Sequence, residues 1–137
     1  MSIATETADR LEITELFARL AALLDGHRPE DAASVYHEDV VVHSPRGGEL
    51  RGIDEVTAFI RSSKVEGEHA QHVNGNVLVH LDGDRARATA DELVYFYRDG
   101  QPPHQTSGLR TACTAVRTPK GWRFSEYEIT LAWTDKK

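Results

Sequence analysis

The stretch VLVHLDGDRARATADELVYFYR, Val77 to Arg98, contains two extended segments with a turn signal between them. Apolar residues occupy every second position from Val77 to Leu81, which is the pattern of a strand that buries one face. Asp82-Gly83 then forms a dipeptide typical of two-residue hairpin loops. The remainder of the stretch continues as a second strand. We therefore predict an antiparallel hairpin here.

Two further strands are predicted downstream, at 109–117 and 122–133, joined by the turn TPKG. The loop DGQPPHQTSG separates them from the hairpin, and it is rich in turn-forming residues. The second half of the chain is therefore expected to be an antiparallel meander.

The first half of the chain has the periodicity of helices. Apolar residues follow a helical stripe, and they are Ile13, Leu16, Phe17, Leu20, Leu23 and Leu24. Asp9 with Glu12 could form a capping box at its start, or Thr7 could start the helix earlier, and Gly26 is expected to end it.

The segment between this helix and the meander is predicted to hold three short elements. Pro29 suits the first turn of a short helix, PEDAASVY. A β-branched run at 39–43 predicts a strand, and 52–62 predicts a third helix. Helices and strands that are segregated in this way indicate an α+β fold, with helices covering one face of a curved sheet.

Size and charge narrow the range of functions. A chain of 137 residues suits one domain, which we take as 1–137. The net charge of −6 argues against nucleic acid or an anionic membrane as a partner. Cys113, the single cysteine, fits a reducing compartment. With no signal-peptide pattern and no long apolar run, a cytoplasmic protein is expected.

HAQHVNGN, from His69 to Asn76, admits several interpretations. Asn74-Gly75 is a hairpin signal, but the segment before it is too short to pair well, so we favour a bulge at Gly75 that re-aims His72. A metal site would use His69, His72, His80 and perhaps His104. However, His69 and His72 point to opposite faces of one strand unless a bulge intervenes, and no cysteine or carboxylate lies at a ligand spacing. No metal or other cofactor is therefore expected.

The order of several short motifs resembles one known family. These motifs are LLDG, SVYHEDVVV, GIDEV, HVNGN and GWRFSEYEITLAW. Together they are similar to the nuclear transport factor 2-like superfamily, in its SnoaL-like and scytalone dehydratase-like branch, over residues 8–134. The resemblance implies a cone-shaped, barrel-like mixed sheet wrapped by three helices around an apolar pocket. It also implies a homodimer that pairs through the outer face of the sheet. The superfamily includes dehydratases, polyketide cyclases, isomerases, epoxide hydrolases and non-catalytic binders, so the fold alone does not settle function.

The resemblance also suggests site residues. An aspartate near the end of the first helix pairs with a histidine in the dehydratases, and these two map to Asp25 and His72. A tyrosine of the first strand falls at about His43. The dehydratases also carry a tyrosine directly before the aspartate, where this chain has Leu24.

The chemistry of Asp25 and His72 fits acid–base catalysis. The helix macrodipole and an apolar cavity would both disfavour a charged carboxylate at Asp25, which would help it exchange a proton. A histidine opposite it across the pocket could take the complementary role. We therefore expect a cofactor-independent dehydratase, cyclase or isomerase acting on a small hydrophobic molecule. The alternatives are that Asp25 is a solvated helix stop, and that the protein is a non-catalytic binding or assembly module.

Three further residues are candidates for substrate binding. His43 could line the pocket or lie at an exposed strand end. Asp91 is either a third pocket acid or a solvated residue of the outer face. His104 could close over the pocket from its loop.

Overall fold

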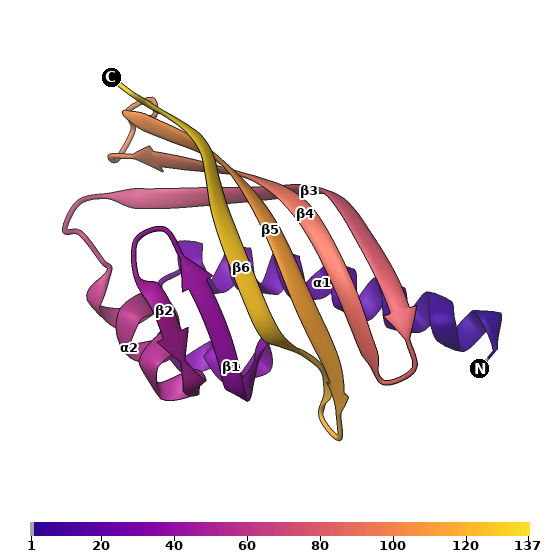
Figure 1. Ribbon diagram of the computed structural model, residues 1–137. Helices are drawn as coiled ribbons and strands as arrows, with labels where there is room; N and C mark the ends of the chain where they lie inside the picture. The colour runs from indigo at the N-terminus through magenta and orange to yellow at the C-terminus, as the bar shows by residue number, and fades with distance from the viewer. Residues whose placement is uncertain (1) are drawn as a thin grey trace.

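A mixed sheet of six strands forms most of the fold, and helices cover one of its faces (Figure 1). The computed structural model describes residues 2–137. The strands are β1 (Tyr36–Ser44), β2 (Gly48–Arg51), β3 (His69–Asp82), β4 (Arg85–Tyr97), β5 (Gln105–Thr118) and β6 (Gly121–Lys136). They lie in the order β2-β1-β6-β5-β4-β3, and β1 and β6 pair in parallel. The predicted α+β class is confirmed. The sheet is strongly curved but does not close into a barrel, since β2 and β3 remain as edges.

The helices differ from their predicted bounds in two places. Helix α1 spans Ile3–Asp25 and starts earlier than predicted, because the Ser2 side chain caps it by accepting a hydrogen bond from the Thr5 backbone N–H. The second helix is a short 3₁₀ helix, η1 (Pro29–Ser34), and β1 already begins at Tyr36, the last residue of the predicted helix. Helix α2 spans Gly52–Ser62, as predicted. Within residues 2–137, none of the helices combines the length and apolarity needed to cross a membrane.

Aromatic side chains fill the core between α1 and the sheet. The rings of Phe17 and Phe124 pack edge to face with centroids 5.1 Å apart, and Phe124 and Tyr127 pack the same way at 5.0 Å. Tyr36 lies against Tyr127 in a third edge-to-face pair. Such pairs favour a fixed arrangement of the rings. The part of the interior around Phe124 and Tyr127 is therefore well filled.

The predicted bulge in β3 is confirmed. The strand is continuous, and its register with β4 shifts between Gly75 and Leu78, where two residues of β3 face one of β4. The left-handed backbone lies at Asn76, with φ of 53°, and not at Gly75 as predicted. The bulge lets His72 and Val77 share the inner face of the sheet although an even number of residues separates them.

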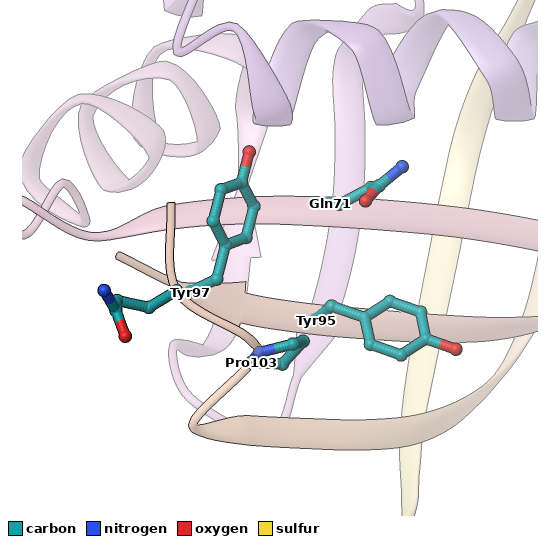
Figure 2. Close-up of a pocket in the computed structure, with 5 residues that line it drawn as sticks. Gln71, Tyr95, Tyr97 and Pro103 are labelled. Atoms are coloured by element: carbon teal, nitrogen blue, oxygen red, sulfur yellow. The ribbon is translucent and has the colours of Figure 1, made fainter. Parts of the chain in front are cut away.

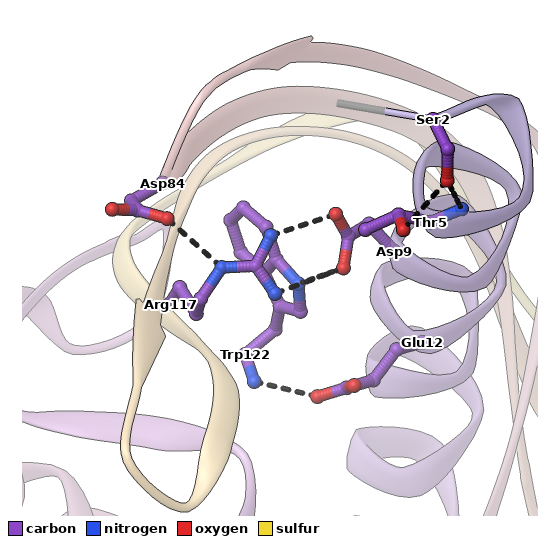
Figure 3. Close-up of polar contacts among 7 residues, drawn as sticks. All are labelled: Ser2, Thr5, Asp9, Glu12, Asp84, Arg117 and Trp122. Atoms are coloured by element: carbon purple, nitrogen blue, oxygen red, sulfur yellow. Dashed lines mark hydrogen bonds and ion pairs between the residues drawn. The ribbon is translucent and has the colours of Figure 1, made fainter.

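A polar network joins the start of α1 to the hairpin between β5 and β6 (Figure 3). The Arg117 guanidinium donates two hydrogen bonds to the Asp9 carboxylate, and the Trp122 indole N–H donates a third at 3.1 Å. The Trp122 backbone N–H donates to Glu12. Asp9 and Glu12 therefore act as long-range partners of the hairpin, and the predicted capping box is wrong.

Candidate active site

Asp25 and His72 are in direct contact where α1 ends against β3. The His72 Nδ1 lies 2.5 Å from Asp25 Oδ1. The backbone N–H of His72 donates to the same carboxylate, at 2.9 Å to Oδ2 and 3.2 Å to Oδ1. The two residues had been expected to face each other across a pocket. They touch instead, because α1 packs along β3 and its last residue reaches the strand.

This contact fixes the orientation of the imidazole ring. A carboxylate that accepts from both the backbone and the ring holds the ring in one rotamer and favours hydrogen on Nδ1. In the neutral ring, Nε2 then carries the free lone pair. The side chain of His72 is 14% exposed and that of Asp25 is 26% exposed, so the pair is partly shielded from water. The donors from His72 also offset the unfavourable macrodipole at Asp25.

A third titratable residue, Glu92, lies beside this pair and was not identified from the sequence. Its Oε1 is 3.7 Å from His72 Nε2, and its side chain is 9% exposed. Burial raises the pKa of the Glu92 carboxyl, while the neighbouring His72 lowers that pKa and the Asp25 charge raises it. A signal was present in the sequence, because strict alternation along β4 buries its even-numbered residues and exposes Asp91.

Other polar side chains surround Glu92 on the inner face. Burial raises the pKa of the Tyr36, Tyr127 and Cys113 side chains, and the nearby Glu92 adds to the rise in each. Asn74 is opposite Glu92 in the ladder between β3 and β4. Its Nδ2 donates to the Phe17 carbonyl, but its buried Oδ1 has no hydrogen-bond donor among the described residues. The site is therefore polar but sparingly hydrogen-bonded.

The three predicted substrate-binding residues lie apart from Asp25 and His72. The side chain of His43 is on the outer face of β1, 3.7 Å from Glu49. Asp91 is on the outer face of β4, where it accepts a hydrogen bond from Asn76 and lies 3.7 Å from Arg110. This is the solvated alternative for Asp91.

His104 lies in the loop between β4 and β5 and pairs with Glu68 at 3.0 Å. His69, another histidine of the metal set considered above, pairs with Asp99 at 2.6 Å. Within residues 2–137, no three His, Cys, Asp or Glu side chains are grouped so that they could hold a metal ion.

Two hollows lie on the outer face of the sheet. One, of about 290 Å³, is lined by Gln71, Tyr95, Tyr97, Gln101 and Pro103 (Figure 2). The other, of about 410 Å³, extends from Asn76 to Thr130 across β3 to β6. Neither is lined by Asp25 or His72, so they are not the interior pocket that the resemblance implies.

Comparisons with known proteins agree with the fold. The pattern of the SnoaL-like domain matches residues 5–128. No curated protein sequence gives a significant match. Three solved structures illustrate the structural similarity. A scytalone dehydratase-like protein of Novosphingobium aromaticivorans is 17% identical, with a TM-score of 0.85 over 99% of this chain and 92% of that one.

A hexachlorocyclohexane dehydrochlorinase of Novosphingobium barchaimii is 14% identical, with a TM-score of 0.86 over 99% of this chain and 94% of that one. A nuclear transport factor 2-like protein of Salmonella enterica is 18% identical, with a TM-score of 0.80 over 92% of both chains. At these identities the structures show a shared fold. The match over residues 5–128 shows more: the chain belongs to the SnoaL-like domain family.

Proposed function

We propose that the protein is a cofactor-independent acid–base enzyme that acts on a small hydrophobic molecule, with His72 as the general base and Asp25 as the residue that orients it. The observation that supports this most is the contact of 2.5 Å between Asp25 Oδ1 and His72 Nδ1. It leaves Nε2 as the basic atom of a ring whose orientation is fixed, and a positioned base of this kind contributes about 10²–10⁴ in rate.

The reaction begins with removal of a proton from carbon. His72 Nε2 accepts a proton from a carbon next to a carbonyl group, and the Asp25 carboxylate stabilises the imidazolium that forms. The electron pair left on the substrate then expels a leaving group from the adjacent carbon. In an isomerisation, the imidazolium instead returns the proton to another carbon of the enolate. Two proteins of similar fold are a scytalone dehydratase-like protein and a hexachlorocyclohexane dehydrochlorinase. Both of these names describe eliminations.

A second candidate function is a non-catalytic binding or assembly module. The location of the two hollows favours it, since both lie on the outer face and neither is lined by Asp25 or His72. The aromatic cluster around Phe124 and Tyr127 also fills part of the interior.

The two candidates can be separated by following proton removal directly. Hydrophobic ketones would be incubated with the protein in deuterium oxide, and proton NMR would report the exchange of hydrogens next to the carbonyl. We expect exchange with the wild type and loss of at least about 10²-fold in His72→Gln. His80→Gln, which changes an exposed histidine of the same strand, is the matched control. Saturable binding of the ketones with no exchange would favour the binding module.

A further inference from the structure

We propose that Glu92 is a second catalytic residue: a neutral carboxylic acid that delivers a proton to the departing oxygen of the substrate while His72 removes the proton from carbon. This inference rests on the proposed function. It also narrows the substrate to a β-hydroxy carbonyl compound, whose leaving group needs a proton.

The geometry places the acid and the base side by side. Glu92 Oε1 and His72 Nε2 are 3.7 Å apart, too far for a direct hydrogen bond, and both side chains project from the inner face of adjacent strands. Asp25 holds the opposite edge of the imidazole ring. The two atoms that face each other are therefore the two that remain free to meet a substrate.

The surroundings of Glu92 favour the neutral carboxyl. The groups that face it are Asp25 from α1, His72 from β3, Tyr36 from β1, Cys113 from β5 and Tyr127 from β6. Of these groups, only the His72 ring can carry a positive charge that would stabilise a carboxylate. That ring is already engaged by Asp25. No side-chain hydrogen bond reaches the Glu92 carboxyl among residues 2–137. A buried carboxylate without donors is unstable relative to the acid.

The orphan oxygen of Asn74 points to the same protonation state. Asn74 is opposite Glu92 across the ladder, and its Oδ1 is buried without a donor. Residues directly opposite each other in a sheet have neighbouring side chains. A carboxylic acid carries an O–H donor and a carboxylate does not, so only the neutral form of Glu92 offers a donor on this side of the ladder.

The proposed step balances in protons and electrons. His72 Nε2 takes the proton from the carbon next to the carbonyl, and the C–H electron pair becomes the new C=C bond. The C–O bond on the adjacent carbon breaks, and its oxygen takes the proton of Glu92 and leaves as water. The imidazolium of His72 then returns a proton to the Glu92 carboxylate through the released water, because the two atoms are too far apart for a direct hydrogen bond. Both residues are restored, and the substrate has lost one molecule of water.

This arrangement discriminates between leaving groups. Chloride departs as a stable anion and needs no proton, whereas hydroxide is a poor leaving group unless it is protonated. An acid next to the base is therefore useful for dehydration and of no use for loss of halide. We infer that the site is built for a hydroxyl substituent, in contrast to the reaction named for the dehydrochlorinase of the same fold.

The first test locates the proton and needs no substrate. The chain has 22 aspartate and glutamate residues, and exposed ones are ionised at pH 7. A neutral carboxyl then stands out by its C=O stretching band in the infrared spectrum. We expect this band in the wild type and in Glu126→Gln, an exposed control on β6, and its loss in Glu92→Gln. A Glu92 that is ionised at pH 7 would overturn the proposal.

The second test uses two probes that differ only in the leaving group, 4-hydroxy-4-phenylbutan-2-one and 4-chloro-4-phenylbutan-2-one. Both give the same conjugated ketone, so one absorbance assay follows both reactions. We expect Glu92→Gln to lower kcat/KM for the hydroxyl probe by about 10²-fold or more. The same variant should lower kcat/KM for the chloride probe far less than for the hydroxyl probe, since loss of chloride does not use the acid.

His72→Gln separates failure of this inference from failure of the proposed function. It should abolish turnover of both probes. If it does so while Glu92→Gln slows both probes equally, Glu92 supports the fold or the enolate oxygen, and the leaving-group role is wrong although the base is correct. If the wild type turns over neither probe, the acid–base enzyme itself is contradicted, and the role of Glu92 with it.

Discussion

Arg117 and Asp9, separated by 108 residues in the chain, form a two-pronged ion pair, with Nη1 to Oδ1 at 3.0 Å and Nη2 to Oδ2 at 2.7 Å. Asp9 is almost completely buried, and it also accepts a hydrogen bond from the Trp122 indole. The pair therefore holds the first turns of α1 against the last hairpin of the sheet.

We predict that Asp9→Asn lowers the free energy of unfolding by roughly 1.5–3 kcal/mol, because it removes charge-assisted hydrogen bonds and leaves part of the network unpaired. Urea denaturation would measure the change. Glu15→Gln is a suitable control, since it removes an exposed ion pair with Arg19, and it should change stability by less than about 0.5 kcal/mol. Equal changes in the free energy of unfolding for the two variants would show that the buried pair contributes no more than an exposed one.

The same pair predicts a dependence on pH. The hydrogen bonds from Arg117 lower the pKa of Asp9, so its folded value lies below the unfolded value of about 3.9. The stabilisation is thus complete above that unfolded value and is lost as pH falls through the folded pKa. The difference in unfolding free energy between wild type and Asp9→Asn should shrink below about pH 4. A difference that stays constant down to pH 2 would contradict this assignment.

Asp25 and His72 are predicted to act as one unit. Asp25→Asn and His72→Gln should each lower kcat by about 10²-fold or more, and the double variant should cost little beyond the worse single variant. Asp25→Asn should also lower stability by about 1 kcal/mol, because it weakens the link between α1 and β3. Steady-state kinetics and thermal melts measure the two effects separately. Full additivity of the kinetic effects would argue for independent roles.

The free energy of unfolding of Glu92→Gln should increase relative to that of the wild type as pH rises. Burial raises the pKa of Glu92, so the native state holds this proton more tightly than the unfolded chain does. The cost of ionising Glu92 is absent below its unfolded value of about 4.3, grows above it and is complete above the folded pKa. Removing the carboxyl removes this cost. Denaturation of both proteins from pH 4 to pH 9 would show a rising advantage for the variant, and a flat difference would argue against it.

The outer face of the sheet is predicted to form a homodimer. Val73 of β3, Leu93 of β4 and Trp133 of β6 lie in one row that crosses β5 at Gly108, and each of the three side chains is at least 37% exposed. A contiguous apolar row of this kind marks an interaction surface. Light scattering of the wild type should give twice the monomer mass of 15.3 kDa, and Leu93→Lys should give the monomer. Leu11→Lys, on the exposed face of α1, should leave the mass unchanged.

Activity is predicted to survive chelators. The reaction proposed for His72 and Glu92 uses only protonation states. Turnover should therefore be the same before and after dialysis against EDTA. Loss of turnover that one divalent metal restores would replace the cofactor-independent mechanism.

Sequence patterns predicted the elements better than their long-range partners. Helix α2 and the hairpin of β3 and β4 follow from local periodicity and turn chemistry, and both are present. Asp9 and Glu12 were assigned to a local cap because capping is a short-range rule, whereas their partners Arg117 and Trp122 are more than 100 residues away. Strand β2 was missed because its residues follow a Pro–Gly-rich turn and lack β-branched side chains.

The site shows the same division. Asp25 and His72 were identified through the family resemblance, whereas the residues alone left open that Asp25 only ends a helix in solvent. Glu92 could have been found from the alternation of Ala86, Ala88 and Ala90, which sets the buried face of β4. Its proximity to His72 could not, because that depends on the register between two strands.

Because β3 contains a bulge, the number of residues between His72 and Leu81 decides on which face of the sheet His72 lies. Deleting Asn76 alone would restore strict alternation from His72 to Leu81, so the histidine should keep its place and only the local bend should be lost. Deleting Gly75 and Asn76 together would reverse the parity and turn the imidazole outward, away from Glu92. The strand can therefore be shortened by one residue but not by two, and the chemistry of the protein depends on whether that number is odd or even.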